Sequence, residues 1–323
     1  MERVISAYRT VHKYRKHIAA GLATALLLKN GRRNLAPEYL VMPYFASLDV
    51  FKFPGEYQNW LVRVAKRDCD YDGAIFPFIT KSTTQPVSGG YYGFGPLKPI
   101  CYVGVPKTFY CSNYIEASEL KICIAPGVAV GLESKTEERF LESVCLSDAA
   151  QKFSIARHLM YFKGNYALVE TLLSPLFVLI GYFLTVHGPR LLNLGTHVTL
   201  GPVLRAHLVA IGVTYVACTL AWASLRRSIG YTVDRKAAEV SEEYAQGAVE
   251  YYKKERELNM ATRILLGAKG DRYFTALGNC KDGVFFNKNG PSVSQRELQA
   301  KKIYDNFLKI SAQVEEEPTS AAL

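Results

Sequence analysis

Two long runs without an ionised side chain dominate the hydrophobic pattern of the chain. They extend over residues 171–189 and 206–225 and contain nineteen and twenty residues. A helix needs about twenty predominantly apolar residues to cross the hydrocarbon core of a bilayer. Buried helices of soluble proteins rarely stay uncharged for so long. The pattern therefore predicts a hairpin of two transmembrane helices within residues 166–225.

A third apolar run lies near the N-terminus and is shorter. Residues 18–28 lack charge, but eleven residues are few for a span. The residues before them are basic, with Glu2 the only acid, which is typical of a mitochondrial targeting segment. We interpret residues 1–34 as a targeting segment with an anchor helix. A cleaved signal and an amphipathic surface helix stay open as alternatives.

The rest of the chain has the mixed pattern of an α+β protein. Residues 35–165 contain strand-like runs around a Gly-rich connection, then two helices, the second capped by Ser147 or Asp148. Residues 226–323 are predicted to be helical and to end in an acidic tail. Because a hairpin returns the chain to the side it left, both segments should form one mixed α/β lobe.

The charge of the chain is strongly basic and unevenly distributed. The formal net charge is +10, and residues 1–67 contain twelve Lys and Arg against four acids. A basic protein can bind nucleic acid, but the predicted spans favour targeting or contact with anionic membrane lipid, and we expect no nucleic-acid partner. The seven cysteines form no CxxC pair and no evident disulfide framework. A pair of Cys101 with Cys111 or Cys123 stays open.

The predicted helix of residues 150–162 can be compared with the metal-binding helix of a zinc peptidase, which is the catalytic alternative. Membrane zinc peptidases of the Oma and CAAX-protease type place an HExxH helix just before a membrane hairpin, and the order of elements here is similar. Arg157 and Tyr161 stand where the two histidines would lie, and no glutamate lies between them. We expect His158 to have no metal role. The resemblance implies a peptidase-like shell without its zinc.

Other candidate ligands are weaker. His187, His197 and His207 are ten residues apart around the hairpin, and we prefer interfacial histidines to haem or copper ligands. We therefore predict no catalytic, cofactor-binding or metal residues and no cofactor.

Two strand-like runs form the predicted site instead. Residues 82–90 and 103–109 are expected to form a sheet edge that binds an extended peptide by strand addition. We call this pair of runs the recognition edge. The predicted partner-binding residues are Thr84, Gln85, Pro86, Val87, Val103, Val105 and Pro106.

Five runs, in this order around the two apolar stretches, closely resemble the transmembrane protein 177 family. They are residues 77–90, 103–109, 146–162, 242–254 and 265–279. The resemblance implies a multi-pass protein of the mitochondrial inner membrane without known catalysis. It also implies partners: cytochrome c oxidase assembly factor 20 and newly made cytochrome c oxidase subunit 2. It supplies no catalytic or metal residue.

The principal hypothesis is a non-enzymatic assembly factor that binds and stabilises oxidase subunit 2 with its assembly partner. The alternative is a membrane-embedded, metallopeptidase-like protein with protease activity. The side of the membrane that holds the lobe stays open, because the basic N-terminus and Arg226, Arg227, Arg235 and Lys236 favour opposite sides.

Overall fold

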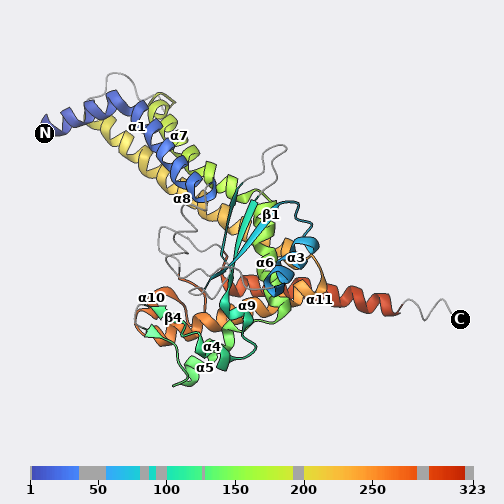
Figure 1. The fold of residues 1–323 in the computed structure, drawn as a ribbon. Coiled ribbons are helices and arrows are strands. Elements are labelled where there is room, and N and C mark those ends of the chain that lie inside the picture. The colour runs from blue at the N-terminus through green and yellow to red at the C-terminus, as the bar shows by residue number, and fades with distance from the viewer. Residues whose placement is uncertain are drawn as a thin grey trace.

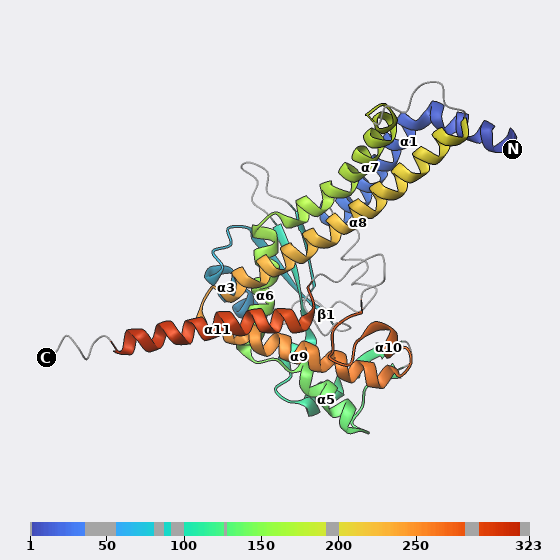
Figure 2. The same cartoon turned by 180° about the vertical axis from the view of Figure 1, so that it is seen from behind.

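The chain is mostly helical, with an arm of three long helices that projects from an α/β lobe (Figure 1 and Figure 2). The computed structural model describes residues 2–35, 56–80, 87–91, 100–125, 128–191, 200–281 and 291–316.

The arm consists of α1 (Glu2–Leu35), α7 (Tyr166–Leu191) and α8 (Leu200–Ala238). These helices lie side by side, and the N-terminus of α1 reaches the tip far from the lobe (Figure 1). Within α7, residues Tyr166–Leu184 have a mean hydropathy of 1.9, and in the described part of the chain this is the one helix long and apolar enough to qualify as a membrane span. The apolar run 18–28 is the middle of a much longer helix.

The lobe contains a three-stranded mixed sheet. β1 (Ala74–Thr80) pairs in parallel with β3 (Ile100–Pro106), and β2 (Val87–Tyr91) pairs with β3 in antiparallel fashion. β3 is therefore the central strand. The remaining elements are α3 (Glu56–Asp68), the 3₁₀ turn η1 (Lys107–Tyr110), α4 (Tyr114–Glu119), β4 (Cys123–Ala125), β5 (Val128–Ala129), α5 (Lys135–Val144), α6 (Asp148–Lys163), α9 (Glu242–Leu266), α10 (Gly270–Tyr273) and α11 (Val293–Glu316).

The two helices predicted before the apolar runs are present as α5 and α6. The Ser147 hydroxyl accepts a hydrogen bond from the Ala150 N–H, so Ser147 and not Asp148 is the N-cap of α6. Helix α6 runs through the centre of the lobe between α9, α8, α3 and the sheet. Its Phe153, Ile155 and Leu159 side chains are fully buried, as expected for a helix with apolar positions on more than one face.

Close packing of α6 on α9 depends on one glycine. A Cβ atom on Gly247 would lie 2.2 Å from the carbonyl oxygen of Ala149, far inside van der Waals contact. The interruption of a helical pattern by glycine, which usually costs about 1 kcal/mol relative to alanine, is therefore required by the approach of the two backbones.

A buried ion pair joins the arm to the lobe. Asp234, near the C-terminal end of α8, is 4% exposed; its Oδ1 accepts a hydrogen bond of 2.7 Å from Nε of Arg157 on α6. Nε of Arg296 on α11 lies 3.4 Å from the other carboxylate oxygen. Both guanidinium groups also stack near the ring of Tyr252. Burial alone would lower the pKa of Arg157, but Tyr252 and Asp234 outweigh it and raise the pKa, so the guanidinium stays charged.

The substitution Gly247→Ala should destabilise the lobe by about 2 kcal/mol or more, because rigid backbone atoms of α6 must move to admit the methyl group. Chemical denaturation of the purified protein in detergent micelles would measure the loss. The control is Gly131→Ala, where the added Cβ meets nothing closer than 3.9 Å and the change should stay within about 0.5 kcal/mol. Equal stability of the two variants would contradict this packing.

The substitution Asp234→Asn should cost about 3–5 kcal/mol, because it removes the carboxylate that pairs with two largely buried guanidinium groups. The same denaturation experiment measures the effect. Glu239→Gln is the matched control, since its pairing with Arg235 is exposed and 3.9 Å long. A loss below about 1 kcal/mol for Asp234→Asn would show that the ion pair does not stabilise the junction.

Candidate functional site

The sheet does not present the recognition edge as predicted. Val103 and Val105 are buried in the core, and Pro106 is buried at the end of the same strand. Since β3 has a hydrogen-bonded neighbour on each side, its backbone cannot accept a further strand. The expectation that 103–109 is part of an edge is therefore wrong. It failed because β1 pairs with β3 by a crossover, which makes β3 the middle strand.

The first run of the predicted recognition edge, residues 82–90, includes the start of an outer strand. Val87 begins β2, the outer strand next to β3 in the strand order β1-β3-β2. Thr84, Gln85 and Pro86 lie outside the described residues. The structure thus brings Val87 beside the buried residues of β3, opposite Gly104.

Helix α6 uses its polar residues for structure where a zinc peptidase would use them for metal. Arg157 is bonded to Asp234, and the Tyr161 ring packs edge-on against Phe162 at 5.5 Å. Throughout the described ranges, no three His, Cys, Asp or Glu side chains gather as a metal ion would require. Of the three spaced histidines, His187 stacks on Phe183 within α7, and His197 lies outside the described residues.

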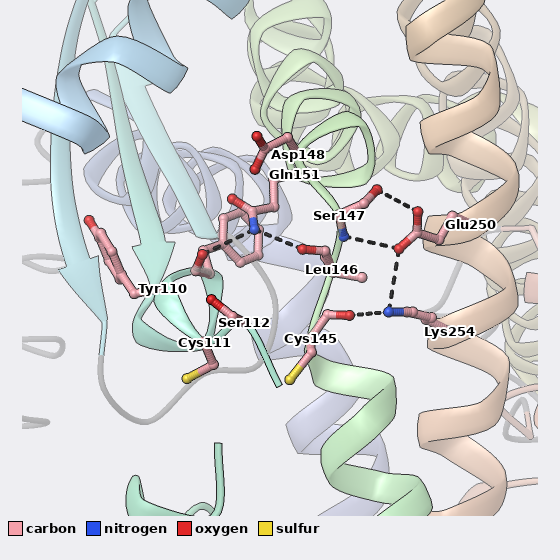
Figure 3. A pocket seen from close by; sticks show the side chains of 11 residues that line it. Tyr110, Cys111, Ser112, Cys145, Leu146, Ser147, Asp148, Gln151, Glu250 and Lys254 are labelled. Atoms are coloured by element: carbon pink, nitrogen blue, oxygen red, sulfur yellow. Dashed lines mark hydrogen bonds and ion pairs between the residues drawn. The ribbon is translucent and has the colours of Figure 1, made fainter. Parts of the chain in front are cut away.

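A polar cavity of about 590 Å³ lies at the N-terminal end of α6 (Figure 3). Three separate segments form it: residues 109–112 after the sheet, residues 145–151 across the link between α5 and α6, and one face of α9. Its lining residues are Phe109, Tyr110, Cys111, Ser112, Cys145, Leu146, Ser147, Asp148, Gln151, Glu250 and Lys254. We call it the α6 pocket.

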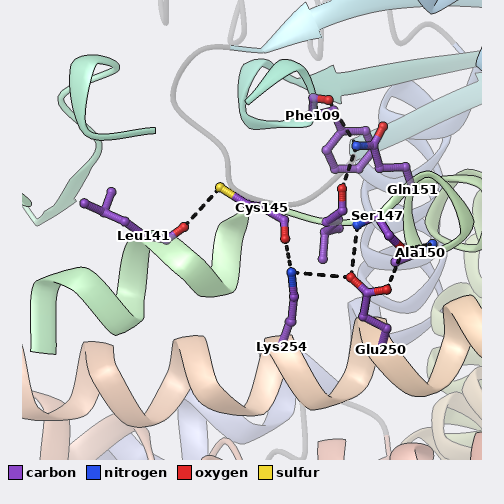
Figure 4. Close-up of polar contacts among 9 residues, drawn as sticks. Phe109, Leu141, Cys145, Ser147, Ala150, Gln151, Glu250 and Lys254 are labelled. Carbon is purple, nitrogen blue, oxygen red and sulfur yellow. Dashed lines mark hydrogen bonds and ion pairs between the residues drawn. The ribbon is translucent and has the colours of Figure 1, made fainter. Parts of the chain in front are cut away.

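The wall of the α6 pocket is held by charged groups from α9 (Figure 4). The Glu250 carboxylate accepts a 3.0 Å hydrogen bond from the Ser147 N–H and a second bond from the Ser147 hydroxyl. The Lys254 ammonium donates to the carbonyl oxygen of Cys145 and lies 3.4 Å from Glu250. These bonds fix the link between α5 and α6 against α9, although their residues are more than a hundred positions apart.

Gln151 fixes the opposite wall. Its Nε2 donates to the carbonyl oxygens of Phe109, at 3.0 Å, and Leu146, at 2.8 Å. Both are backbone groups, so one buried side chain holds the loop after the sheet and the α5–α6 link at a fixed separation. The pocket is therefore preformed rather than assembled by a ligand.

The two thiols of the α6 pocket are poor nucleophiles. Burial is the main cause that raises the pKa of Cys145 to about 11, and the neighbouring Cys111 thiol and the Glu116 carboxylate add to it. Burial and Glu116 also raise the pKa of Cys111. Since the thiolate is the reactive form, the geometry favours binding of a ligand over covalent chemistry at these sulfur atoms.

Part of this pocket was visible in the sequence. The Ser147 cap was predicted, and Gln151 is a polar residue on a helix predicted to be buried, which is a signal of a specific hydrogen-bonding role. The contribution of Glu250 and Lys254 was missed, because their alternation of charge is typical of a solvated helix face.

Comparison with known proteins identifies relatives that all have the same name. The chain is similar to Transmembrane protein 177 of Mus musculus, with 34% identity over 222 residues that cover 67% of this chain and 68% of that protein. The Homo sapiens protein of the same name is 34% identical over 229 residues, 70% and 71% of the two chains. The Xenopus laevis protein is 26% identical over 308 residues, 88% and 92%. No family model and no solved structure matches.

Alkylation of Cys145 by iodoacetamide should rise about tenfold per pH unit from pH 7.5 to pH 10, because its thiolate fraction is still growing there when the pKa is about 11. Mass spectrometry of the Cys145 peptide after timed labelling measures the rate. Far-UV circular dichroism across the same range controls for unfolding. A rate that levels off by pH 9 would mean that burial does not suppress ionisation of this thiol.

Proposed function

Because the chain belongs to the transmembrane protein 177 family, we propose that it acts in the mitochondrial inner membrane as a non-enzymatic assembly factor. In this proposal it is a multi-pass protein that binds newly made cytochrome c oxidase subunit 2 together with assembly factor 20. The arm lies in the bilayer beside the client, and the lobe binds the client or its partner in the aqueous phase.

The observation that carries the proposal is the surface of the arm. Most of the large apolar side chains exposed in the described part of the chain lie on α1, α7 and α8, including Leu176 and Phe183 on α7 and Val213 and Leu220 on α8. So many exposed apolar side chains on three neighbouring helices are unfavourable in water, whereas lipid tails or the apolar helices of a client would cover them.

Charged groups at the base of the arm support two spans. Arg226 of α8 lies 3.2 Å from Glu170 of α7, and these two residues are the lobe-side limits of the two uncharged runs. The Arg226 guanidinium also lies over the Trp222 ring at 4.9 Å. Tryptophan and arginine are favoured at the membrane–water interface. A run of nineteen helical residues is roughly 28 Å long, close to the thickness of the hydrocarbon core.

Non-covalent binding of an unassembled membrane subunit, without a chemical reaction, is the mechanism that fits these features. An unassembled membrane subunit exposes helix faces that its final partners would cover. The arm offers an apolar, preformed bundle for such faces. Basic residues next to the interface, including Arg226 and Arg227, are suited to anionic lipid head groups. The metallopeptidase alternative lacks a set of three ligands among the described residues.

Pulse-labelling of mitochondrial translation in cells that express the tagged chain tests this proposal. We expect labelled subunit 2 and assembly factor 20 to co-purify with the chain, and unassembled subunit 2 to be degraded faster in cells without it. Oxidase subunit 1, another newly made membrane subunit, is the control and should be recovered much less. Equal recovery of the two subunits, or release of the chain by alkaline carbonate, would contradict the proposal.

A further inference from the structure

One acceptor in the α6 pocket has no donor. Gln151 is 3% exposed, and its Nε2 is committed to two backbone carbonyls, which fixes the orientation of the amide. The other amide atom, Oε1, is buried and has no hydrogen-bond partner among the described residues. Leaving such an acceptor unpaired in the protein interior is unfavourable. A ligand that donates a hydrogen bond here would recover that free energy.

The surroundings of this acceptor are acidic. Asp148 lies three residues earlier on α6, so the two side chains share one face of the helix. In Figure 3 the Gln151 oxygen points toward the side of the pocket that holds the Asp148 carboxylate. Asp148 and Glu250 provide two negative charges. Among the described residues of the lining, Lys254 is the one cation, and it is bonded to Glu250 and to the Cys145 carbonyl.

An anion does not fit the same place, although helix N-termini often bind anions. The Ser147 N–H is bonded to the Glu250 carboxylate, and the Ala150 N–H is bonded to the Ser147 hydroxyl. The positive end of the α6 dipole is therefore already compensated by Glu250 and by Asp148 in the first turn.

We propose that the α6 pocket binds a positively charged side chain, an arginine or a lysine, of a partner polypeptide. The ligand would donate one hydrogen bond to Gln151 Oε1 and place its charge beside Asp148. Arginine suits the pocket best, because its planar guanidinium carries five donors and can bond both acceptors at once. The inference rests on the proposed function only in taking the bound partner to be a polypeptide.

Peptide binding to the full-length chain in lipid nanodiscs tests the inference. The probe is a fluorescein-labelled pentapeptide, Gly-Ala-Arg-Ala-Gly, and its matched control contains citrulline, which keeps the shape of arginine and removes the charge. We expect the citrulline peptide to bind roughly tenfold more weakly in fluorescence anisotropy, as loss of one charge-assisted contact predicts. Equal binding of the two peptides would overturn the inference and indicate that the pocket holds water.

The variant Asp148→Asn should weaken binding of the arginine peptide roughly tenfold and leave binding of the citrulline peptide nearly unchanged. Glu239→Gln, an exposed change just after the C-terminal end of α8 and outside the pocket, is the control and should not alter either affinity. Asparagine is tolerated in a first helical turn, so folding should be retained, and circular dichroism verifies this. An unchanged affinity for the arginine peptide in the Asp148 variant would overturn the inference.

Two further readouts identify the source of the cation and separate this inference from the proposed function. Free arginine amide should compete only at much higher concentration than the peptide; equal competition would overturn the polypeptide assignment. If subunit 2 co-purifies in mitochondria but the peptides do not bind, only the pocket inference fails. If the peptides bind with charge selectivity and subunit 2 does not co-purify, only the proposed function fails.

Discussion

The architecture depends on one buried carboxylate. Helix α8 is a single 39-residue helix whose first part belongs to the arm and whose last turns enter the lobe, where Asp234 lies between Arg157 and Arg296. Burying these charges is costly unless they pair with each other. The pairing can form only when α6, α8 and α11 are in register. The same contact that stabilises the lobe therefore also fixes the direction in which the arm leaves it.

The arginine in this contact gives the central helix α6 a structural role at the position where the zinc-peptidase alternative would require a metal ligand. Arg157 stands where a first zinc ligand would lie, and its guanidinium is directed toward α8. A histidine could not provide the same fixed charge at neutral pH, because its pKa lies near 6.5. The position is thus specialised for joining helices, and Gly247 brings α9 close enough to complete the packing.

Local features were predictable from the sequence, and pairings between distant segments were not. The cap at Ser147 and the helices α5 and α6 follow from turn residues and hydrophobic periodicity within short windows. The strand order, by contrast, depends on contacts between distant segments. Periodicity indicates that β1, β2 and β3 are strands, but it does not show that β3 lies between the other two. For this reason the prediction that Val103 and Val105 belong to a sheet edge was wrong. The α6 pocket was not predicted, because its three segments meet only in the folded lobe.

The distance between the arm and the α6 pocket limits how a client could use both. Helix α7 begins just after the C-terminal end of α6, and the pocket lies at the other end of that 16-residue helix, roughly 24 Å away. An extended chain covers about 3.3 Å per residue, so under both proposals about seven residues would separate the membrane segment of a client from the side chain bound in the pocket. A shorter connection could not engage both surfaces, whereas a matching one makes the second contact intramolecular. Two individually weak contacts, one apolar and one charged, would then hold a subunit firmly yet release it once a permanent partner displaces either.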